Sequence, residues 1–339
     1  MNERYSRQVI FTPIGEAGQK KITGKHVLLV GAGALGTGNA EALVRAGVGK
    51  LTIVDRDYVE ISNLQRQQLY TEKDAFERLP KAVAAKKHLK EINSGSEAAA
   101  HIMDAGPGDL LRLSEGVDLI IDGTDNFESR MMINDVSMQK NIPWIYGGCA
   151  GSYGITYTFT PGRTPCMHCL LQTLPSKALT CDAAGIISPA VSMVVSYQVA
   201  DALKILVEDW DAVRQRLTSF DVWSNEFSSV DVRGLKKAAC PSCGEKPQYP
   251  FLKYENQMKS AVLCGRDAVQ IRPSVLKPVE LERVGSQLEH VVEKVEVNPY
   301  LLACKTGKHR IVLFRDGRAL IHGTNDIKEA KSLYHRYFN

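Results

Sequence analysis

Four cysteines have the spacing of metal ligands. Cys166 and Cys169 form one C-x-x-C turn, and Cys240 and Cys243 form a second. Two such turns brought together offer four thiolates in a tetrahedral arrangement, which is the ligand set of a structural zinc site. His168, inside the first turn, is an alternative ligand, but four cysteines complete the coordination without it. The spacing predicts a closed Zn²⁺ site that ties the segment around residue 240 to the preceding fold.

A glycine pattern near the N-terminus is typical of phosphate binding. Gly31, Gly33 and Gly36 have the spacing G-x-G-x-x-G between an apolar run and a helical pattern that starts near Ala34. Glycines let the backbone approach phosphates, and a helix N-terminus offers unpaired N–H groups and a positive dipole end. Asp55 ends the next apolar run, where a carboxylate accepts a hydrogen bond from a ribose hydroxyl. The pattern predicts nucleotide binding, with a purely structural glycine turn as the alternative.

Cationic and acidic side chains distinguish between classes of nucleotide. Arg7, Arg66 and Lys81 carry positive charge, and Asp122 and Asp125 follow a later apolar run. A dehydrogenase has no need of several cations beside a second acidic cluster. A Mg²⁺-triphosphate needs cations for its phosphates and a carboxylate for the metal. These residues therefore favour ATP over NAD, with an NAD-dependent oxidoreductase and a non-catalytic zinc adaptor as the alternatives.

The remaining cysteines comprise one candidate for reactivity and three predicted core residues. Cys181 lies in a loop of small residues before an apolar helical segment. A position near a helix N-terminus lowers the pKa of a thiol, so Cys181 is a candidate nucleophile, with an inert, half-buried thiol as the alternative. Cys149, Cys264 and Cys304 lie in strand-like apolar runs and are predicted to be core residues.

The elements that must position these residues alternate between strands and helices. This order predicts a Rossmann-like α/β fold with a mostly parallel sheet, and the period of two in residues 154–159 predicts an antiparallel extension. Because ligands lie beyond the carboxyl ends of parallel strands, Asp55, Asp122 and Asp125 are expected to face one cleft. The predicted strands are 26–30, 51–54, 98–103, 118–121, 143–147, 154–159, 217–222 and 229–232, and the predicted helices are 81–93, 109–115, 127–140 and 189–207.

The chain is predicted to have two domains, residues 1–250 and residues 251–339. Residues 244–250 have the composition of a linker. Beyond them, the alternating pattern around Asp316 and Gly317 predicts a β-hairpin, and residues 327–334 have the pattern of an amphipathic helix. The second domain is therefore expected to be a small α+β unit, of unknown role.

Composition excludes several classes of protein. The 339 residues are 44% hydrophobic and 24% charged, with a formal net charge of +4. This charge is too small and too dispersed for binding to nucleic acid or to an anionic membrane. The charged N-terminus has no signal-peptide core, and polar residues interrupt the apolar segment 185–207. We therefore expect a cytoplasmic protein without a membrane-spanning helix.

The assembled motifs resemble the ThiF/MoeB family, the bacterial relatives of ubiquitin-activating enzymes. The resemblance runs from about Arg4 to Cys243 through RYSRQV, VGAGALG, VDRDYVEISNLQRQ, PK, GTDN, PCMHC, LTC and CPSC. It implies an ATP-dependent adenylyltransferase that activates the C-terminal glycine carboxylate of a small β-grasp sulfur-carrier protein ending in Gly-Gly. It also implies a homodimer, each subunit of which binds one carrier tail.

The resemblance also implies roles for individual residues. The turn from Gly31 to Gly36 packs on the nucleotide, and Asp55 takes the ribose. Arg7 reaches into the neighbouring subunit's site as an arginine finger in trans, and Cys181 matches a cysteine that takes the carrier covalently in some members. The four turn cysteines match the zinc ligands of the family. The residues implied to hold the phosphates, Mg²⁺ and the reacting centre are Ser62, Asn63, Leu64, Gln65, Arg66, Lys81, Asp125 and Asn126.

The motifs leave the pathway of the carrier open between two possibilities. Carriers for molybdopterin and for thiamine thiazole both end in Gly-Gly, and we favour the molybdopterin carrier, with the thiamine carrier as the alternative. Residues 251–339 do not match a rhodanese domain, so we expect sulfur to come from another protein. A terminal carboxylate is ionised at neutral pH and needs no general base. Loss of Arg66 or Lys81 is therefore expected to lower the rate far more than the stability.

Overall fold

The chain divides into two compact units, Met1–Asn256 and Gln257–Asn339. The computed structural model describes residues 3–171, 185–253, 260–263, 267–273 and 278–338, with the side chains of 260–263 left out. Cys181 and Cys264 lie outside the described residues. The two units are described separately below.

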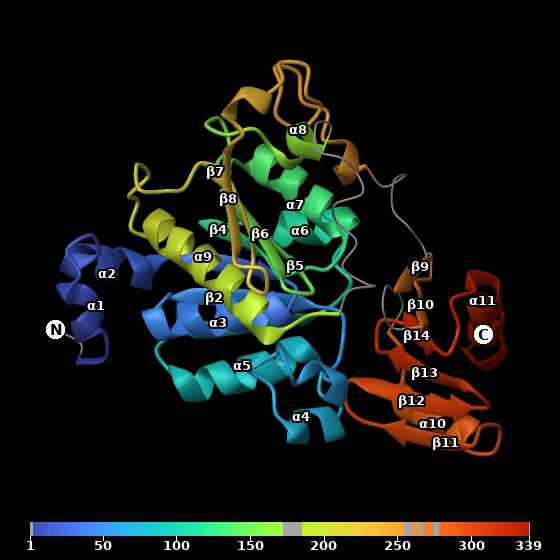
Figure 1. Cartoon of the computed structure of the whole chain (residues 1–339). Coiled ribbons are helices and arrows are strands. Elements are labelled where there is room, and N and C mark those ends of the chain that lie inside the picture. Colours follow the sequence, from blue (N-terminus) through green and yellow to red (C-terminus); the bar gives the residue numbers. More distant parts are fainter. Residues whose placement is uncertain (1–2, 172–184, 254–259, 264–266, 274–277, 339) are drawn as a thin grey trace. The chain divides into compact units, whose positions relative to one another are not determined.

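The first unit is built on an eight-stranded sheet with the order β3-β2-β1-β4-β5-β6-β7-β8 (Figure 1). Strands β1 to β5 pair in parallel, and β6, β7 and β8 add antiparallel pairs at one side. The predicted Rossmann-like sheet with an antiparallel extension is confirmed. The strands are β1 His26–Val30, β2 Lys50–Asp55, β3 Glu97–Ile102, β4 Leu119–Asp122, β5 Trp144–Ala150, β6 Tyr153–Phe159, β7 Arg216–Asp221 and β8 Glu226–Asp231.

Helices cover both faces of this sheet because its central strands are apolar on both sides. In β1, Val27 and Leu29 belong to one buried cluster, and Leu28 and Val30 belong to another. Helices α3, α5 and α9 contribute to the first cluster and α6 and α7 to the second, so they lie on opposite faces (Figure 1). The helices of this unit are α1 Ser6–Ile10, α2 Gly15–Gly24, α3 Ala34–Ala46, α4 Glu72–Phe76, α5 Lys81–Ile92, α6 Pro107–Leu113, α7 Phe127–Lys140, α8 Met167–Leu171 and α9 Ser188–Leu206.

Several helix ends follow directly from their sequences. Helix α3 ends where Gly47 adopts the left-handed conformation at φ +90°, and its N–H bonds back to the last turn. Helix α7 begins at Asn126, whose side chain accepts a hydrogen bond from the N–H of Ser129, and it ends at Asn141 with φ +56°. These caps place the start of α7 at the carboxyl end of β4, close to Asp122 and Asp125.

The second unit is a six-stranded antiparallel sheet with the order β11-β12-β13-β14-β10-β9. The turn between β13 and β14 contains Asp316 and Gly317, where the hairpin was expected. Helices α10 and α11 both pack on one buried cluster, which includes Ala330, Tyr334 and Cys304. Its elements are β9 Ser260–Leu263, β10 Ala268–Ile271, α10 Leu281–Leu288, β11 Lys294–Val297, β12 Leu301–Thr306, β13 His309–Phe314, β14 Ala319–His322 and α11 Ile327–Phe338.

Within the described residues, no helix is both long enough and apolar enough to cross a membrane. Helix α9 is the most apolar of the long helices, and its buried face carries Gln198 and Asp201 as well as aliphatic side chains.

Candidate active site and metal centre

The three glycines of the turn between β1 and α3 have different structural roles. Gly31 has φ +91°, and a side chain there would collide with the backbone of Gly123 after β4. A side chain at Gly36 would collide with the carbonyl oxygen of Gly31, so these glycines allow close backbone packing. Gly33 is different, because a Cβ atom there would have no neighbour nearer than 3.9 Å. The space above Gly33 at the N-terminus of α3 therefore fits a ligand group, as expected for a phosphate.

Asp55 supports this turn from the end of β2. Its carboxylate accepts hydrogen bonds from the backbone N–H groups of Ala32 and Asp57, each at 2.6 Å. Burial raises the pKa of Asp55, although Lys81 and these two N–H groups act in the opposite direction. The buried Tyr70 hydroxyl donates to the carbonyl oxygen of Ala32 at 2.7 Å. Asp55 thus shapes the glycine turn from inside, whichever ligand binds above it.

Lys81 lies at the first position of α5 and is buried. Its Nζ forms an ion pair with Asp57 Oδ2 at 3.2 Å, and its backbone N–H donates to the Asp57 carbonyl at 2.9 Å. The charge of Lys81 lies close enough to Asp55 to oppose the effect of burial on the pKa of that carboxylate. Lys81 is therefore part of a buried carboxylate–ammonium group beside the glycine turn. The sequence analysis missed Asp57, whose signal was its position two residues after Asp55.

Asp125 is exposed and lies near a second missed residue, Arg56. Arg56 forms an ion pair with Asp104 at 3.1 Å. Burial alone would lower the pKa of Arg56, but Asp104, Asp57 and Asp125 outweigh it and raise this pKa. Asp57 thus connects the Lys81 ion pair with the Arg56–Asp104 ion pair, because it is the partner of Lys81 and also lies close to Arg56. The carboxyl ends of β2 and β4 therefore share one group of alternating charges, which we call the charged cluster. Its members are Lys81, Asp57, Arg56, Asp104 and Asp125.

Asp122 does not face the cleft, and this part of the prediction is wrong. The side chain is fully buried, with Arg130 Nε at 3.0 Å and the Thr124 hydroxyl at 2.6 Å. Burial raises the pKa of Asp122, while Arg130 and Thr124 favour its charged form. The physical reason is that Arg130, in the first turn of α7, is buried next to this carboxylate and forms an ion pair with it. Asp122 anchors α7, and Asp125 alone of the two remains exposed.

The segment of residues 61–67 contains a short 3-10 helix, Ile61–Asn63, and bends over the start of α3. Arg66 donates from Nη1 to the carbonyl oxygen of Ser62 at 3.0 Å, and it lines a groove together with Ala34. Buried Asn63 accepts from the N–H of Glu60 at 3.2 Å, which caps the segment. Leu64 packs against the core, and Gln65 is exposed. Arg66 therefore lies beside the glycine turn.

Gln67 is a residue of this segment that the sequence analysis did not single out. It is 3% exposed, and its amide is the neighbour at 3.9 Å from the Cβ position of Gly33. Its Oε1 atom is buried and has no hydrogen-bond partner among the described residues. A buried amide oxygen without a partner is costly, so this atom fits a site that a ligand completes. The signal was present as the second glutamine of the Q-R-Q tripeptide.

The remaining predicted site residues are Asn126, Arg7 and Cys181. Asn126 caps α7 with its side-chain oxygen, which leaves its amide N–H₂ group for other contacts. Arg7 lies exposed in α1. Cys181 lies outside the described residues. The structure therefore brings Lys81 and Asp125 to one charged cluster and Arg66 to the glycine turn.

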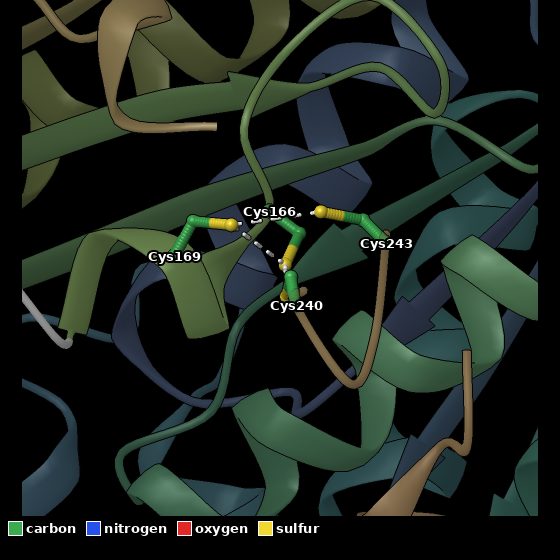
Figure 2. A group of neighbouring side chains, drawn as sticks. All are labelled: Cys166, Cys169, Cys240 and Cys243. Atoms are coloured by element: carbon green, nitrogen blue, oxygen red, sulfur yellow. Dashed lines mark hydrogen bonds between the residues drawn. The ribbon is translucent and has the colours of Figure 1, made fainter. Parts of the chain in front are cut away.

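The four predicted metal ligands converge at one point. Figure 2 shows the sulfur atoms of both C-x-x-C turns pointing toward one another, and all lie within 4.8 Å. The Sγ separations are 3.9 Å for Cys166–Cys169 and 3.6 Å for both Cys166–Cys240 and Cys169–Cys243. Tetrahedral bonds of 2.3 Å to zinc require sulfur separations of about 3.8 Å. The donor set and its spacing therefore fit a tetrahedral thiolate site.

The thiols of this cluster differ in acidity. The neighbouring thiols, Cys166 first among them, lower the pKa of Cys243 to about 5, whereas burial raises the pKa of Cys169 to about 11. Metal binding would displace the protons of these thiols, because thiolates are the metal ligands.

This chain is similar to one known family along most of its length. The model of the ThiF family matches residues 5–242. The chain is 54% identical to the sulfur carrier protein ThiS adenylyltransferase of Bacillus subtilis (strain 168), over 99% of each chain. It is 33% identical to a sulfur carrier protein adenylyltransferase of Thermus thermophilus, over 75% of this chain and 95% of the relative.

Two further similarities cover about three quarters of this chain, and the second shows the fold alone. The adenylyltransferase and sulfurtransferase MOCS3 of Culex quinquefasciatus is 33% identical, over 78% of this chain and 60% of the relative. The crystal structure of Escherichia coli MccB matches with a TM-score of 0.65 and 20% identity, over 73% of each chain. On the family model and the whole-length similarity, this chain belongs to the ThiF family.

Proposed function

We propose that this chain uses ATP to adenylate the C-terminal glycine carboxylate of a ThiS-type sulfur-carrier protein. The chain is an adenylyltransferase, as its family and its relatives indicate. The observation that carries the choice of carrier is the 54% identity to a ThiS adenylyltransferase, which extends over both units. The molybdopterin carrier, favoured on the motifs alone, is the weaker choice, because the motifs are shared whereas the whole-length similarity is to the thiamine-type enzyme.

The proposed reaction needs positioning and charge stabilisation more than proton transfer. A carboxylate oxygen of the carrier's last glycine attacks the α-phosphorus of ATP, the bond to the bridging oxygen breaks, and pyrophosphate leaves. Both reactants are anions, so cations must reduce their repulsion and stabilise the developing charge. We assign this role to two cationic side chains near the glycine turn, Lys81, whose ammonium group is paired with Asp57, and Arg66.

We assign the roles within the site as follows. The glycine turn and the N-terminus of α3 bind phosphate above Gly33, with Gln67 beside it. Asp125 and Asn126 hold Mg²⁺ and orient the reacting groups. Mg²⁺, when bound, would neutralise part of the triphosphate charge. Asp55 takes the ribose with lone pairs that its two backbone hydrogen bonds leave available.

The assembly proposed for this reaction is a homodimer. Arg7, exposed in α1, would complete the neighbouring subunit's site. Zn²⁺ in the four-cysteine centre would have no open position and therefore a structural role. The carrier would be a small β-grasp protein ending in Gly-Gly, and Cys181 is the proposed site of any covalent carrier intermediate. We also propose that the second unit supplies no sulfur itself.

Exchange of radioactive pyrophosphate into ATP tests the choice of carrier. The purified enzyme is incubated with ATP, Mg²⁺ and either a ThiS-type or a molybdopterin-type carrier at matched concentration. We expect exchange with the ThiS-type carrier at least about tenfold faster, which corresponds to roughly 1.4 kcal/mol of discrimination. A carrier lacking its last glycine is the control. Faster exchange with the molybdopterin carrier would reverse the assignment.

A further inference from the structure

Helix α7 holds the first cysteine turn and the segment after the second through two adjacent polar residues, Asn134 and Asp135. Both are fully buried, in a helix whose other buried residues are mostly apolar. Buried polar side chains are costly unless they are hydrogen-bonded, so their partners indicate their purpose. Neither residue belongs to the nucleotide site described above.

Asn134 holds the first cysteine turn. Its Oδ1 accepts a hydrogen bond from the backbone N–H of Met167 at 2.8 Å. Met167 stands between the ligands Cys166 and Cys169, so this bond fixes the backbone of the turn itself. The other side of the Asn134 amide donates to Asp135 Oδ1 at 3.2 Å, which links the two buried residues.

Asp135 holds the segment that follows the second cysteine turn. Its Oδ2 accepts a hydrogen bond from the backbone N–H of Phe251 at 2.9 Å. Ser242, which stands between Cys240 and Cys243, lies near this carboxylate without a hydrogen bond to it. The ring of His168, from the first turn, also lies in the field of the carboxylate.

We propose that Asn134 and Asp135 are positioning residues of the metal centre, which hold the two cysteine turns at bonding distance on one helix. The two turns come from distant parts of the sequence, and α7 also packs against α8 and against the 3-10 helix Pro250–Leu252. Adjacent residues on a helix point about 100° apart, so one pair can reach two separate turns. Hydrogen-bonded partners behind metal ligands orient them, and their loss costs about 10–100-fold in metal affinity.

Metal affinity of the whole enzyme tests this proposal without ATP or carrier. The reduced, metal-free protein is titrated with Co²⁺, whose thiolate charge-transfer and d–d absorption bands report tetrahedral sulfur coordination, and Zn²⁺ affinity is then measured by chelator competition. We expect Asn134→Ala and Asp135→Ala to lose about 10–100-fold in affinity for both metals. Asp135→Asn keeps an acceptor for the Phe251 N–H but loses the acceptor for Asn134, so it should lose less affinity than Asp135→Ala.

Ser137→Ala is the matched control. Ser137 is a buried α7 residue whose hydroxyl donates to the Ile142 carbonyl at 2.6 Å, away from both cysteine turns. It should lose stability but not metal affinity. Wild-type affinity in both alanine variants, an equal loss in Ser137→Ala, or no Co²⁺ bands in the wild type would overturn the proposal. The two Asp135 variants provide an independent test if Asn134→Ala does not fold.

Discussion

Lys81 and Arg66 share one predicted role but lie in different environments. Lys81 is 2% exposed and paired with Asp57, whereas Arg66 is half-buried and reaches a backbone carbonyl with Nη1. Removal of one member of a buried ion pair leaves the other charge uncompensated. The expectation that both substitutions spare the fold therefore needs correction for Lys81.

We predict that Arg66→Ala separates activity from stability. Carrier-dependent pyrophosphate exchange should fall about 10²–10³-fold, as for other groups that stabilise transition-state charge. The free energy of unfolding should change by no more than about 0.5 kcal/mol. Lys81→Met is the comparison variant, and it should lose activity and also about 3–5 kcal/mol of stability, measured by denaturant unfolding. Equal stability losses in both variants would contradict this distinction.

Asp74 provides a prediction for pH dependence. Its Oδ2 accepts hydrogen bonds from the Thr71 N–H at 2.8 Å and lies 2.7 Å from His88 Nε2. Burial alone would raise the pKa of Asp74, but His88 and Thr71 outweigh it and lower this pKa below its ordinary 3.8. A lowered native pKa means that the carboxylate stabilises the fold above the ordinary pKa. This contribution is lost as the pH falls through the native value.

Asp74→Asn should therefore be less stable than the wild type at pH 7, by on the order of 1–2 kcal/mol. The difference should shrink as the pH falls below about 4, because the wild-type carboxylate is then protonated as well. Thermal unfolding of both proteins at several pH values measures this. A difference that grows toward acid pH would show that the shift has the opposite sign.

At the scale of the element, the glycine turn can be tested with one matched pair. Gly33 has open space at its Cβ position, whereas Gly36 would collide with the Gly31 carbonyl. We predict that Gly33→Ala leaves the Tm nearly unchanged and raises the KM for ATP at least about tenfold, because the methyl group takes ligand space. Gly36→Ala should cost about 3 kcal/mol or more by overpacking. Unchanged ATP binding in a folded Gly33→Ala would place the phosphates elsewhere.

The elements themselves could be predicted where one local signal defines both ends. Helix α7 has the predicted bounds, 127–140, because Asn126 and Asn141 provide its caps. The side chains at strand ends were harder. Asp122 ends β4 and Asp125 follows it, and which of the two faces the site depends on Arg130, whose direction is set by the packing of α7. The roles of Asn134 and Asp135 were also invisible, since their partners come from distant turns.

At the scale of the whole molecule, the fold class could be predicted from composition and periodicity. The continuous apolar runs indicated parallel strands, and the period of two indicated the antiparallel extension. The four-cysteine centre could be predicted as well, because two C-x-x-C turns carry their own spacing. The charged cluster could be predicted only in part. Asp57 and Arg56 were missed because a charged residue in a loop is ordinarily solvated, and only packing shows that these two are paired with Lys81 and Asp104.

Metal removal should affect the fold of the first unit directly. We predict that treatment of the metal-loaded enzyme with a strong chelator lowers its Tm by on the order of 10 °C, because binding energy at a thiolate site is folding energy. Calorimetry with and without the chelator measures the change. Cys243→Ser, which lacks one ligand, should respond much less. A wild-type Tm that is insensitive to chelation would exclude a structural metal.

The central claim is that the charged cluster at the carboxyl ends of β2 and β4 adenylates a carrier tail. The most direct measurement is carrier-dependent ATP–pyrophosphate exchange by Asp125→Ala. As the control we choose Glu115→Ala, which removes an exposed carboxylate just after α6. We predict a loss of at least about 100-fold in Asp125→Ala, since the metal loses its carboxylate, and no loss in Glu115→Ala. Exchange at the wild-type rate in folded Asp125→Ala would contradict the account.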